Sequence, residues 1–544
     1  MTLIPREDQL TSNYSLCRKE KSRHIIVSCA FKLADSQAND RGQHMHIHSR
    51  RLPVFTDLRD FIKFCEEQGE LIRISEPVSM KLQATELQRR VMTKNGPALL
   101  IENPIKSDGT LSAMPALINL FGTVKRVAWS LGCNEEELIA FGEFLAYLRQ
   151  PQPPERSEIL PAIGPLLKAA TSLRGKVQSR AQCQQVIHTG EDIDLDTLPI
   201  QTCWPEEPAP LITWPIVITK PAASDEIKSY NWGVYRIQQA SKNTLIMRWL
   251  ENRGGAAHFR QWKAQGQDMP IAIAIGSDPA TIMGAVTPIP ETLSEAQFSG
   301  LFRGKPTQLV KAKTQPLLVP ANAEIVIEGT VSATETLPEG PYGDHTGYYN
   351  AVEQFPKVTV TGITHRKDPI YLSTYTGRAP DEPSVISEAL NDVFMPLVRQ
   401  AFPEVVDCWL PPETASYRVA VISIDKRYAG QARRVMMGMW SMLPQFNMTK
   451  LIIIVDSHIN ARSWEDVMWA VATKADPARD LLRVDNTPID YLDFASPLEG
   501  LGGKLGIDAT DKIGSETSRE WGRELKMDPK TIHEVDDLVA KLKL

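Results

Sequence analysis

The stretch EGPYGDHTGYY, residues 339–349, places two carboxylates and a histidine among three glycines, a proline and three tyrosines. Gly and Pro interrupt regular secondary structure, so this stretch is predicted to be a loop whose glycines allow positive φ angles or close approach to a ligand. It follows a predicted strand over Ala323–Gly329. A loop leaving a rigid sheet is a common place for catalytic groups, and the alternative is an ordered turn whose acids cap backbone amides.

Short β segments recur on both sides of this loop. Between about 183 and 374 the sequence alternates such segments with Gly and Pro turns, and one short helix is predicted over 293–301. Evenly recurring short strands with few long helices are typical of a barrel or sandwich. The predicted strands lie at 211–219, 245–250, 271–275, 325–331, 358–364 and 370–374.

Two α/β regions flank this β region. On the N-terminal side, an amphipathic helix opens at Asp57 and is followed by strands near 70–74 and 98–101. On the C-terminal side, strands alternate with helices, which predicts a parallel sheet. The predicted C-terminal elements are a helix over 385–401, a strand over 417–424, a helix over 430–443, a strand over 450–455 and a helix over 463–475.

The last part of the chain carries two further signals. The glycine-rich stretch 500–506 lacks the preceding strand and the GKS/T ending of a phosphate loop, so we interpret it as a turn. The helix predicted over 532–542 has one apolar face, as expected for packing on a neighbour or another subunit. That face consists of Val535, Leu538, Val539 and Leu542.

Composition narrows the class of protein. With 544 residues, 42% of them hydrophobic and 23% charged, the chain is predicted to form two or three globular domains. No apolar run approaches the length of a membrane span, and the net charge of −6 argues against nucleic acid as a partner. The seven cysteines include no CxxC pair, which suits a reducing cytoplasm and gives no thiolate metal site.

Three arginines upstream of the loop are candidates for ligand binding. They lie in the runs Asn231–Arg236, Arg248–Leu250 and Arg253–Gly255, interleaved with aromatic residues and glycines. Guanidinium groups bind phosphate and stack on planar rings, so these runs predict a pocket for a phosphate and an aromatic ring. The alternative is ion pairing on the surface of a strand.

The segment Thr292–Glu295 resembles a capping box at the start of a helix. In that interpretation Glu295 only caps backbone amides. Alternatively, Glu295 and Asn231 supply oxygen ligands to a hard divalent cation that bridges to a phosphate. Spacing alone favours the cap.

Taken together, these motifs resemble the UbiD family of carboxy-lyases over about residues 54–540. The segments that carry the resemblance are Asn231–Arg236, Arg248–Leu250, Thr292–Glu295, Glu339–Tyr349 and Thr487–Asp493. The resemblance implies a mixed α/β fold with a central split β-barrel that binds prenylated FMN. It divides the chain into an N-terminal extension (1–52), a small α/β unit (53–125), the split-barrel domain (126–376), an α/β domain (377–498) and a tail with an oligomer-forming helix (499–544).

The resemblance also implies site residues. Arg236, Glu339 and Asp344 match the catalytic network of the family, and Asn231 and Glu295 match its metal ligands, with Mn²⁺ and also K⁺ as candidate ions. Asn252 stands where some members of the wider family have a His ligand. The residues expected to line the cofactor are Val234, Tyr235, Arg236, Arg248, Trp249, Leu250, Arg253 and Gly254.

The implied reaction is non-oxidative decarboxylation of a 3-polyprenyl-4-hydroxybenzoate to a 2-polyprenylphenol in ubiquinone biosynthesis. Loss of CO₂ leaves an aryl carbanion equivalent that no side chain stabilises alone, so a cofactor must act as electron sink. The alternatives are another aromatic or unsaturated acid as substrate, or a flavin-binding scaffold without turnover. A flavin prenyltransferase as cofactor supplier, a homohexamer and a cytoplasmic location at the periphery of the inner membrane are also implied.

The two carboxylates of the loop are expected to titrate differently. We expect Glu339 to be paired with Arg236 and to stay ionised. Asp344 is expected to face apolar cofactor and substrate, to have a raised pKa, and to protonate the ring carbon after CO₂ leaves.

Overall fold

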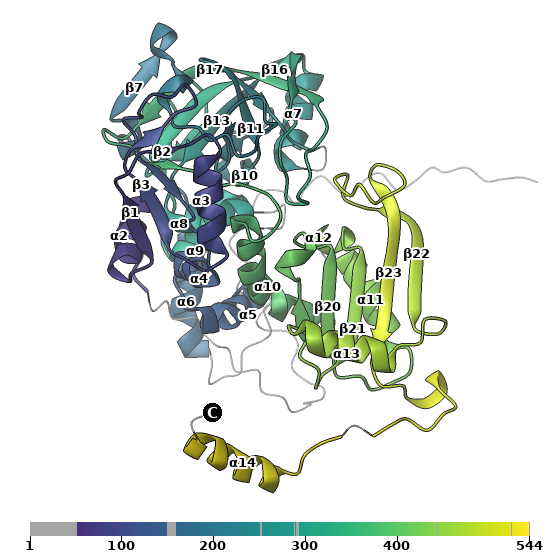
Figure 1. The fold of residues 1–544 in the computed structure, drawn as a ribbon. Coiled ribbons are helices and arrows are strands. Elements are labelled where there is room, and N and C mark those ends of the chain that lie inside the picture. Colours follow the sequence, from purple (N-terminus) through teal and green to yellow (C-terminus); the bar gives the residue numbers. More distant parts are fainter. Residues whose placement is uncertain are drawn as a thin grey trace, which may run out of the picture.

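The computed structural model describes residues 52–149, 159–250, 253–287, 289, 293–442, 444–523 and 525–542. All but the last residue of the predicted extension, together with Asn252 and Thr292, lies outside these residues. In Figure 1 the N-terminal elements and the β domain form one lobe, and the C-terminal sheet forms a second lobe that α10 (Glu382–Ala401) joins to the first. The predicted mixed α/β fold class is confirmed.

The N-terminal unit is built on a four-stranded sheet in the order β1-β3-β5-β18. Its last strand, β18, comes from beyond the β domain, so the chain returns to this sheet before it enters α10. Helix α2 begins where the Asp57 side chain accepts from the amide of Asp60, and buries its apolar face. The elements are α2 (Leu58–Glu67), β1 (Leu71–Ile74), α3 (Gln83–Met92), β3 (Ala98–Ile101), β5 (Ala116–Ile118) and β18 (Tyr371–Leu372); β2 (Val78–Ser79) and β4 (Pro104–Ile105) form a separate pair.

The β domain contains one nine-stranded sheet in the order β10-β9-β13-β16-β17-β12-β11-β8, with β7 also paired to β17. Among the described residues, the end strands β10 and β8 do not pair with each other. The strands are β7 (Val186–Thr189), β8 (Leu211–Ile212), β9 (Ile216–Thr219), β10 (Asn231–Val234), β11 (Ile237–Ser241), β12 (Thr244–Met247), β13 (Met269–Ile275), β16 (Ile325–Glu339) and β17 (Glu353–His365).

Strands β16 and β17 form a long antiparallel hairpin that ends with Glu339 opposite Glu353. The predicted loop therefore begins one residue later than expected, because Glu339 is still part of a strand. Its carboxylate is held by a rigid ladder, whereas Asp344 lies in the connection. The backbone of Glu339 is therefore held by the sheet, and that of Asp344 is not.

Helix α5 packs on α10, the helix that joins the two lobes. Gly142 on α5 permits close packing on α10, because a Cβ at that position would lie 2.1 Å from the carbonyl oxygen of Val393. The remaining elements of this lobe are α4 (Val124–Leu131), α5 (Leu138–Arg149), α6 (Ile159–Ser172), β6 (Lys176–Gln178), α7 (Gly254–Ala264), α8 (Pro279–Val286), α9 (Glu295–Arg303), β14 (Gln308–Lys311) and β15 (Leu318–Pro320).

The C-terminal lobe has a five-stranded sheet in the order β19-β20-β21-β23-β22. The three central strands are parallel, and the two edge strands are antiparallel to them. The predicted parallel sheet is thus right only for the centre. The elements are β19 (Val405–Trp409), β20 (Val419–Ile424), α11 (Gln431–Met442), α12 (Pro444–Asn447), β21 (Leu451–Asp456), α13 (Trp464–Lys474), β22 (Leu481–Pro488) and β23 (Leu501–Ala509).

The turn predicted over 500–506 is wrong. Only Gly500 is in a turn, with φ +69°, and Leu501 already begins strand β23. The glycines of this strand serve packing: a Cβ at Gly506 would lie 2.4 Å from the sulfur of Met436 on α11, and one at Gly502 would lie 2.7 Å from Ser496. The glycines predicted a turn because glycine is depleted in strands. In this strand, close packing against neighbouring side chains overrides that preference.

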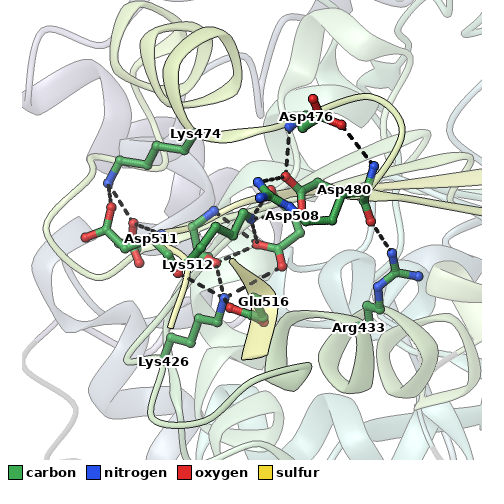
Figure 2. Close-up of polar contacts among 12 residues, drawn as sticks. Lys426, Arg433, Lys474, Asp476, Asp480, Asp508, Asp511, Lys512 and Glu516 are labelled. Atoms are coloured by element: carbon green, nitrogen blue, oxygen red, sulfur yellow. Dashed lines mark hydrogen bonds and ion pairs between the residues drawn. The ribbon is translucent and has the colours of Figure 1, made fainter. Parts of the chain in front are cut away.

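Buried lysines and carboxylates gather where the central strands of this sheet end (Figure 2). The Lys512 ammonium lies 3.1 Å from Asp508, and the Lys426 ammonium lies 2.6 Å from Glu516. Buried charges are costly unless they are paired, so these contacts favour one conformation of the chain that follows β23. They attach residues 510–516 to the sheet.

Helix α14 (Pro529–Leu542) lies apart from both lobes at the end of an extended segment (Figure 1). No residue of this helix is buried within the chain. The predicted apolar face is exposed to solvent, with exposed fractions of 47% for Val535 and 57% for Leu542. Packing of this face on another subunit remains a prediction.

Two other expectations concern cysteines and membranes. The cysteines in the described ranges form no disulfide, and each is buried: Cys65, Cys133, Cys183, Cys203 and Cys408. No helix in the described part of the chain is both long and apolar enough to cross a bilayer.

Candidate active site

Arg236, between β10 and β11, is the centre of the site. Its Nε and Nη2 atoms donate to the two carboxylate oxygens of Glu339 at 2.7 and 3.1 Å. Its Nη1 atom donates to Asp344 Oδ2 at 3.2 Å. The structure therefore brings together the three residues that the sequence predicted as a network, and Glu339 takes the paired role with a two-pronged hydrogen bond.

A second guanidinium lies beside the first. Arg248 follows β12, and its amide donates to the carbonyl oxygen of Arg236 at 3.2 Å, which extends the β11–β12 ladder. Its Nε lies 3.5 Å from Glu339. Burial, followed by the positive charge of Arg236, lowers the pKa of Arg248. Within the described part of the chain, the buried Nε and Nη2 atoms of Arg248 have no hydrogen-bond partner, which suits an anionic ligand at this position.

The loop is shaped by a residue that the sequence analysis missed. Asn350 Oδ1 accepts from Arg236 Nη2 at 3.0 Å and from the amide of Tyr342 at 2.9 Å. The Tyr342 ring lies under the guanidinium of Arg236, 5.1 Å from its central carbon. Gly340 and Gly347 adopt φ angles of +92° and +82°, as the glycine signal predicted. Asn350 followed the recognised stretch by one residue and carried no signal of its own.

The expected raised pKa of Asp344 is wrong. Burial alone raises the pKa of this carboxyl, but the hydrogen bond from His345 Nδ1, at 2.8 Å, and the charges of His345 and Arg236 outweigh burial. The pKa of Asp344 is therefore held well below its usual range. Burial lowers the pKa of His345, but the hydrogen bond to Asp344 and the negative charges of Asp344 and Asp490 prevail and raise that pKa to about 9. At neutral pH the pair is an imidazolium and a carboxylate.

A different carboxyl near the loop has a raised pKa. Burial raises the pKa of Glu207 to about 7, against the hydrogen bonds that this carboxylate accepts. Glu207 accepts from the amide of Cys203 at 2.6 Å and from that of Gly343 at 3.4 Å. Sequence analysis missed it because it lies more than 130 residues before the loop and outside every recognised motif.

Asn231 and Glu295 form a second cluster of polar side chains, apart from the one around Arg236. Asn231 Nδ2 donates to Glu295 Oε1 at 3.2 Å, and the amide of Trp232 donates to Glu295 Oε2 at 2.8 Å. Glu295 does not cap its own helix: the capping box is formed by Ser294 and Gln297. The capping box that spacing favoured for Glu295 is therefore wrong, and the Glu295 carboxylate is bonded to Asn231 and Trp232 instead.

This cluster fits a hard cation in part. Burial raises the pKa of Glu295, and its hydrogen bonds come from neutral groups, so a cation would compensate its charge. Within the described ranges, no group of three or more His, Cys, Asp or Glu side chains is placed to hold a metal ion. Protein side chains there thus supply two oxygen-bearing ligands, and further oxygens must come from a phosphate or water.

The glycines beside this cluster allow its side chains to pack closely against the backbone. A Cβ at Gly254 would lie 2.8 Å from Asn231, and one at Gly233 would lie 2.7 Å from the ring of Tyr235. Helix α7 begins at Gly254, and its N-cap, Arg253, makes no side-chain hydrogen bond to the helix. The first amides of a helix are a common binding site for phosphate.

The other residues expected at the cofactor surround this helix start. The Tyr235 hydroxyl donates to Asn231 Oδ1 at 2.7 Å and accepts from the amide of Gly255 at 3.2 Å. Its ring meets Trp249 edge-on, with centroids 6.2 Å apart. Val234 ends β10, and the carbonyl oxygen of Leu250 accepts from the amide of Arg253 at 3.0 Å.

Family models match three successive parts of the chain. They are described as the N-terminal domain (62–142), the Rift-related domain (175–379) and the C-terminal domain (384–509) of 3-octaprenyl-4-hydroxybenzoate carboxy-lyase. The chain belongs to the UbiD family. The predicted family and enzyme class are thereby confirmed, and the protein is a carboxy-lyase.

Solved structures of two decarboxylases and of a UbiD-class enzyme are similar to this chain over most of its length. Vanillic acid decarboxylase of Sedimentibacter hydroxybenzoicus, in its closed form, is 26% identical with a TM-score of 0.76, and the match covers 90% of this chain and 100% of that one. HmfF of Pelotomaculum thermopropionicum, solved with FMN, is 26% identical with a TM-score of 0.70 over 88% and 99% of the two chains. Klebsiella pneumoniae 3,4-dihydroxybenzoic acid decarboxylase, at 19% identity and a TM-score of 0.70 over 88% and 99%, shares the fold.

In this UbiD-family chain the C-terminal domain borders the arginines. The ring of Tyr491 lies 5.1 Å from the guanidinium carbon of Arg248. The segment that carries Tyr491 was one of those on which the resemblance rested, and the structure places it at the site.

Proposed function

We propose that this protein decarboxylates a 3-polyprenyl-4-hydroxybenzoate to a 2-polyprenylphenol in ubiquinone biosynthesis, with prenylated FMN and Mn²⁺ as cofactors. The observation that carries the proposal is the convergence of Arg236, Glu339 and Asp344 beside a glycine-lined helix start. The description of the three matching family models supports this substrate.

The cofactor would be held by the arginines and by the N-terminus of α7. Prenylated FMN supplies the electron sink for the electrons of the broken carbon–carboxyl bond. The residues proposed to hold it are Val234, Tyr235, Arg236, Arg248, Trp249, Leu250, Arg253 and Gly254. Asn231 and Glu295 are proposed to hold the metal ion, Mn²⁺ with K⁺ as a second candidate, against the cofactor phosphate.

The residues of the chain would then move one proton. Arg236 would bind Glu339 through its two-pronged hydrogen bond and supply positive charge where the substrate carboxylate lies. After CO₂ leaves, negative charge develops on the ring carbon and Asp344 delivers a proton to it. Because Asp344 is ionised at rest, we propose that this proton comes from Nδ1 of the His345 imidazolium, which donates to Asp344 at 2.8 Å.

Replacing Glu295 with Gln is expected to lower metal and flavin occupancy together, because the cation couples the phosphate to the protein. The protein is co-expressed with a flavin prenyltransferase, and metal content, cofactor mass and absorption spectrum are measured after purification. Gln297→Ala is the matched control: it alters the capping box of the same helix and leaves Glu295 in place. Glu295→Gln protein with full flavin and no metal would contradict the bridging role.

Aromatic side chains beside the catalytic loop favour a substrate with an apolar tail. The rings of Tyr348 and Phe494 are in contact, with centroids 5.8 Å apart, and are 65% and 58% exposed. A prenyl chain would cover this surface and gain free energy in proportion to the area buried. Since such a substrate partitions into lipid, we propose that the protein is cytoplasmic and associates peripherally with the inner membrane.

Vanillic acid decarboxylase, at a TM-score of 0.76, favours a second candidate, namely a smaller aromatic acid without a prenyl chain. The two candidates are distinguished by comparing initial rates for 4-hydroxybenzoates with and without a 3-prenyl group.

Exposure of the apolar face of α14 supports the proposed homohexamer, in which this helix covers a neighbouring copy.

A further inference from the structure

A segment of the C-terminal domain contacts the catalytic loop from the opposite lobe. It follows β22 and spans Asp490–Phe494. His345 Nε2 lies 3.6 Å from Asp490 Oδ2, and the Tyr348 ring meets Phe494. The loop that carries Asp344 is therefore in contact with both domains.

His345 is placed between two carboxylates that belong to different domains. Its Nδ1 meets Asp344 Oδ1 at 2.8 Å on its own loop, and its Nε2 faces Asp490 across the domain boundary. The Nε2 atom is buried and has no hydrogen-bond partner among the residues that the structure describes, so the contact at 3.6 Å is an ion pair and its distance can still shorten. The orientation of the imidazole thus depends on both acids.

Asp490 is itself held firmly. The Tyr417 hydroxyl donates to its Oδ2 at 2.9 Å, and the amide of Leu492 donates to its Oδ1 at 3.0 Å. Arg418 Nη2 lies 3.3 Å from the same carboxylate. The contact with His345, the hydrogen bond from Leu492 and the charge of Arg418 outweigh burial, and they lower the pKa of Asp490 to about 2. A fixed negative charge is therefore presented to His345.

We propose that Asp490 is a positioning residue for proton delivery: from the C-terminal domain it holds the His345 imidazolium in the orientation in which Nδ1 donates to Asp344. The proton-delivering pair is then complete only while the two domains are in contact. This inference rests on the proposed function of Asp344 and deepens it, because it gives domain contact a direct effect on the catalytic loop.

The neighbouring Asp493 separates this role from a structural one. It lies on the same segment and is equally buried, but its partners are Lys450 at 2.7 Å and Arg418 at 3.8 Å, both in the C-terminal domain. Loss of Asp493 would weaken that domain without changing the charge that faces His345. Asp493→Asn is therefore the matched control for Asp490→Asn.

The first readout is the titration of His345, which does not depend on turnover. In protein labelled at its ten histidines, the ¹⁵N shifts of the His345 ring are followed with pH, and His345→Gln identifies the signal. Asp490→Asn is expected to lower the His345 pKa by on the order of one unit, since an opposite charge is lost, and Asp490→Glu is expected to restore it. The charged and titratable groups around this pair are Asp344, Asp490, Tyr417, Arg418, Arg236 and Asp381.

The second readout is kinetic, in cofactor-loaded enzyme. Asp490→Asn is expected to lower kcat by ~10- to 100-fold, as a small misplacement of a catalytic group does, with flavin occupancy and KM nearly unchanged. The alkaline limb of the pH–kcat profile of Asp490→Asn should move to lower pH, because His345 loses its proton at a lower pH in this variant. Asp493→Asn should change neither kcat nor this limb, even where its thermal stability falls.

An unchanged His345 titration in Asp490→Asn would overturn the proposal, whether or not the enzyme turns over. A shifted titration with no turnover of any acid by wild-type enzyme would support the positioning and count against the proposed function instead. If Asp490→Asn does not fold, His345→Gln removes the same contact from the loop side. A folded, flavin-loaded His345→Gln enzyme with wild-type kcat would then overturn the proposal.

Discussion

Replacing Asp344 with Asn is expected to leave flavin occupancy intact and to lower decarboxylation by at least ~10²-fold, the contribution typical of a general acid. Asn keeps the size of the side chain but neither takes up the proton from His345 nor delivers it to carbon. Turnover is measured in cofactor-replete protein, together with the exchange of solvent deuterium into the product ring. Both should be lost.

The control for this variant is Glu335→Gln on the same hairpin, where the exposed carboxylate pairs with Lys357. It should keep full activity. Near-normal turnover of flavin-loaded Asp344→Asn would contradict the assignment. The role would then move to Glu339, to a bound water or to Glu207, whose pKa of about 7 already suits a proton donor.

Replacing Arg236 with Gln is expected to have the largest effect on both stability and activity. Glu339 has no exposed side-chain surface, and Arg236 is its two-pronged partner. Removing one member of a buried ion pair leaves an uncompensated charge, which costs roughly 3–5 kcal/mol of unfolding free energy. The activity of flavin-loaded protein should fall by ~10²- to 10³-fold, because a fixed positive charge at the reacting carboxylate is lost.

A double-mutant cycle tests this explanation. Arg236→Gln combined with Glu339→Gln should recover part of the stability, since the buried charge is gone, but none of the activity. Urea unfolding gives the stability and decarboxylation the activity. Additive losses of stability would show that the two side chains do not stabilise each other, and recovered activity would remove Arg236 from the proposed mechanism.

The sequence predicted the parts of the site that lie in compact motifs. Arg236, Glu339 and Asp344 were expected together and do meet, because each follows or ends a strand of one sheet. Gly340 and Gly347 have the positive φ angles that their loop required. The mixed α/β fold class was predicted from the alternation of strands and helices, which hydrophobic periodicity in a single sequence reveals.

What the sequence could not predict came from distant residues. The pKa of Asp344 goes down and not up because His345 beside it is kept charged by Asp490, which lies 145 positions further along the chain. Glu207 and Asn350 act on the loop through hydrogen bonds to its backbone and to Arg236, and such contacts leave no local motif. Gly502 and Gly506 were predicted to lie in a turn, because a glycine in the sequence does not show which side chains pack against it.

The central claim is tested most directly by one reaction. The enzyme, co-expressed with a flavin prenyltransferase and loaded with cofactor, is given a 3-prenyl-4-hydroxybenzoate in deuterium oxide, and the product is analysed by mass spectrometry. The account predicts a 2-prenylphenol with one deuterium at the carbon that lost CO₂. Recovery of unchanged acid from fully loaded enzyme would contradict it.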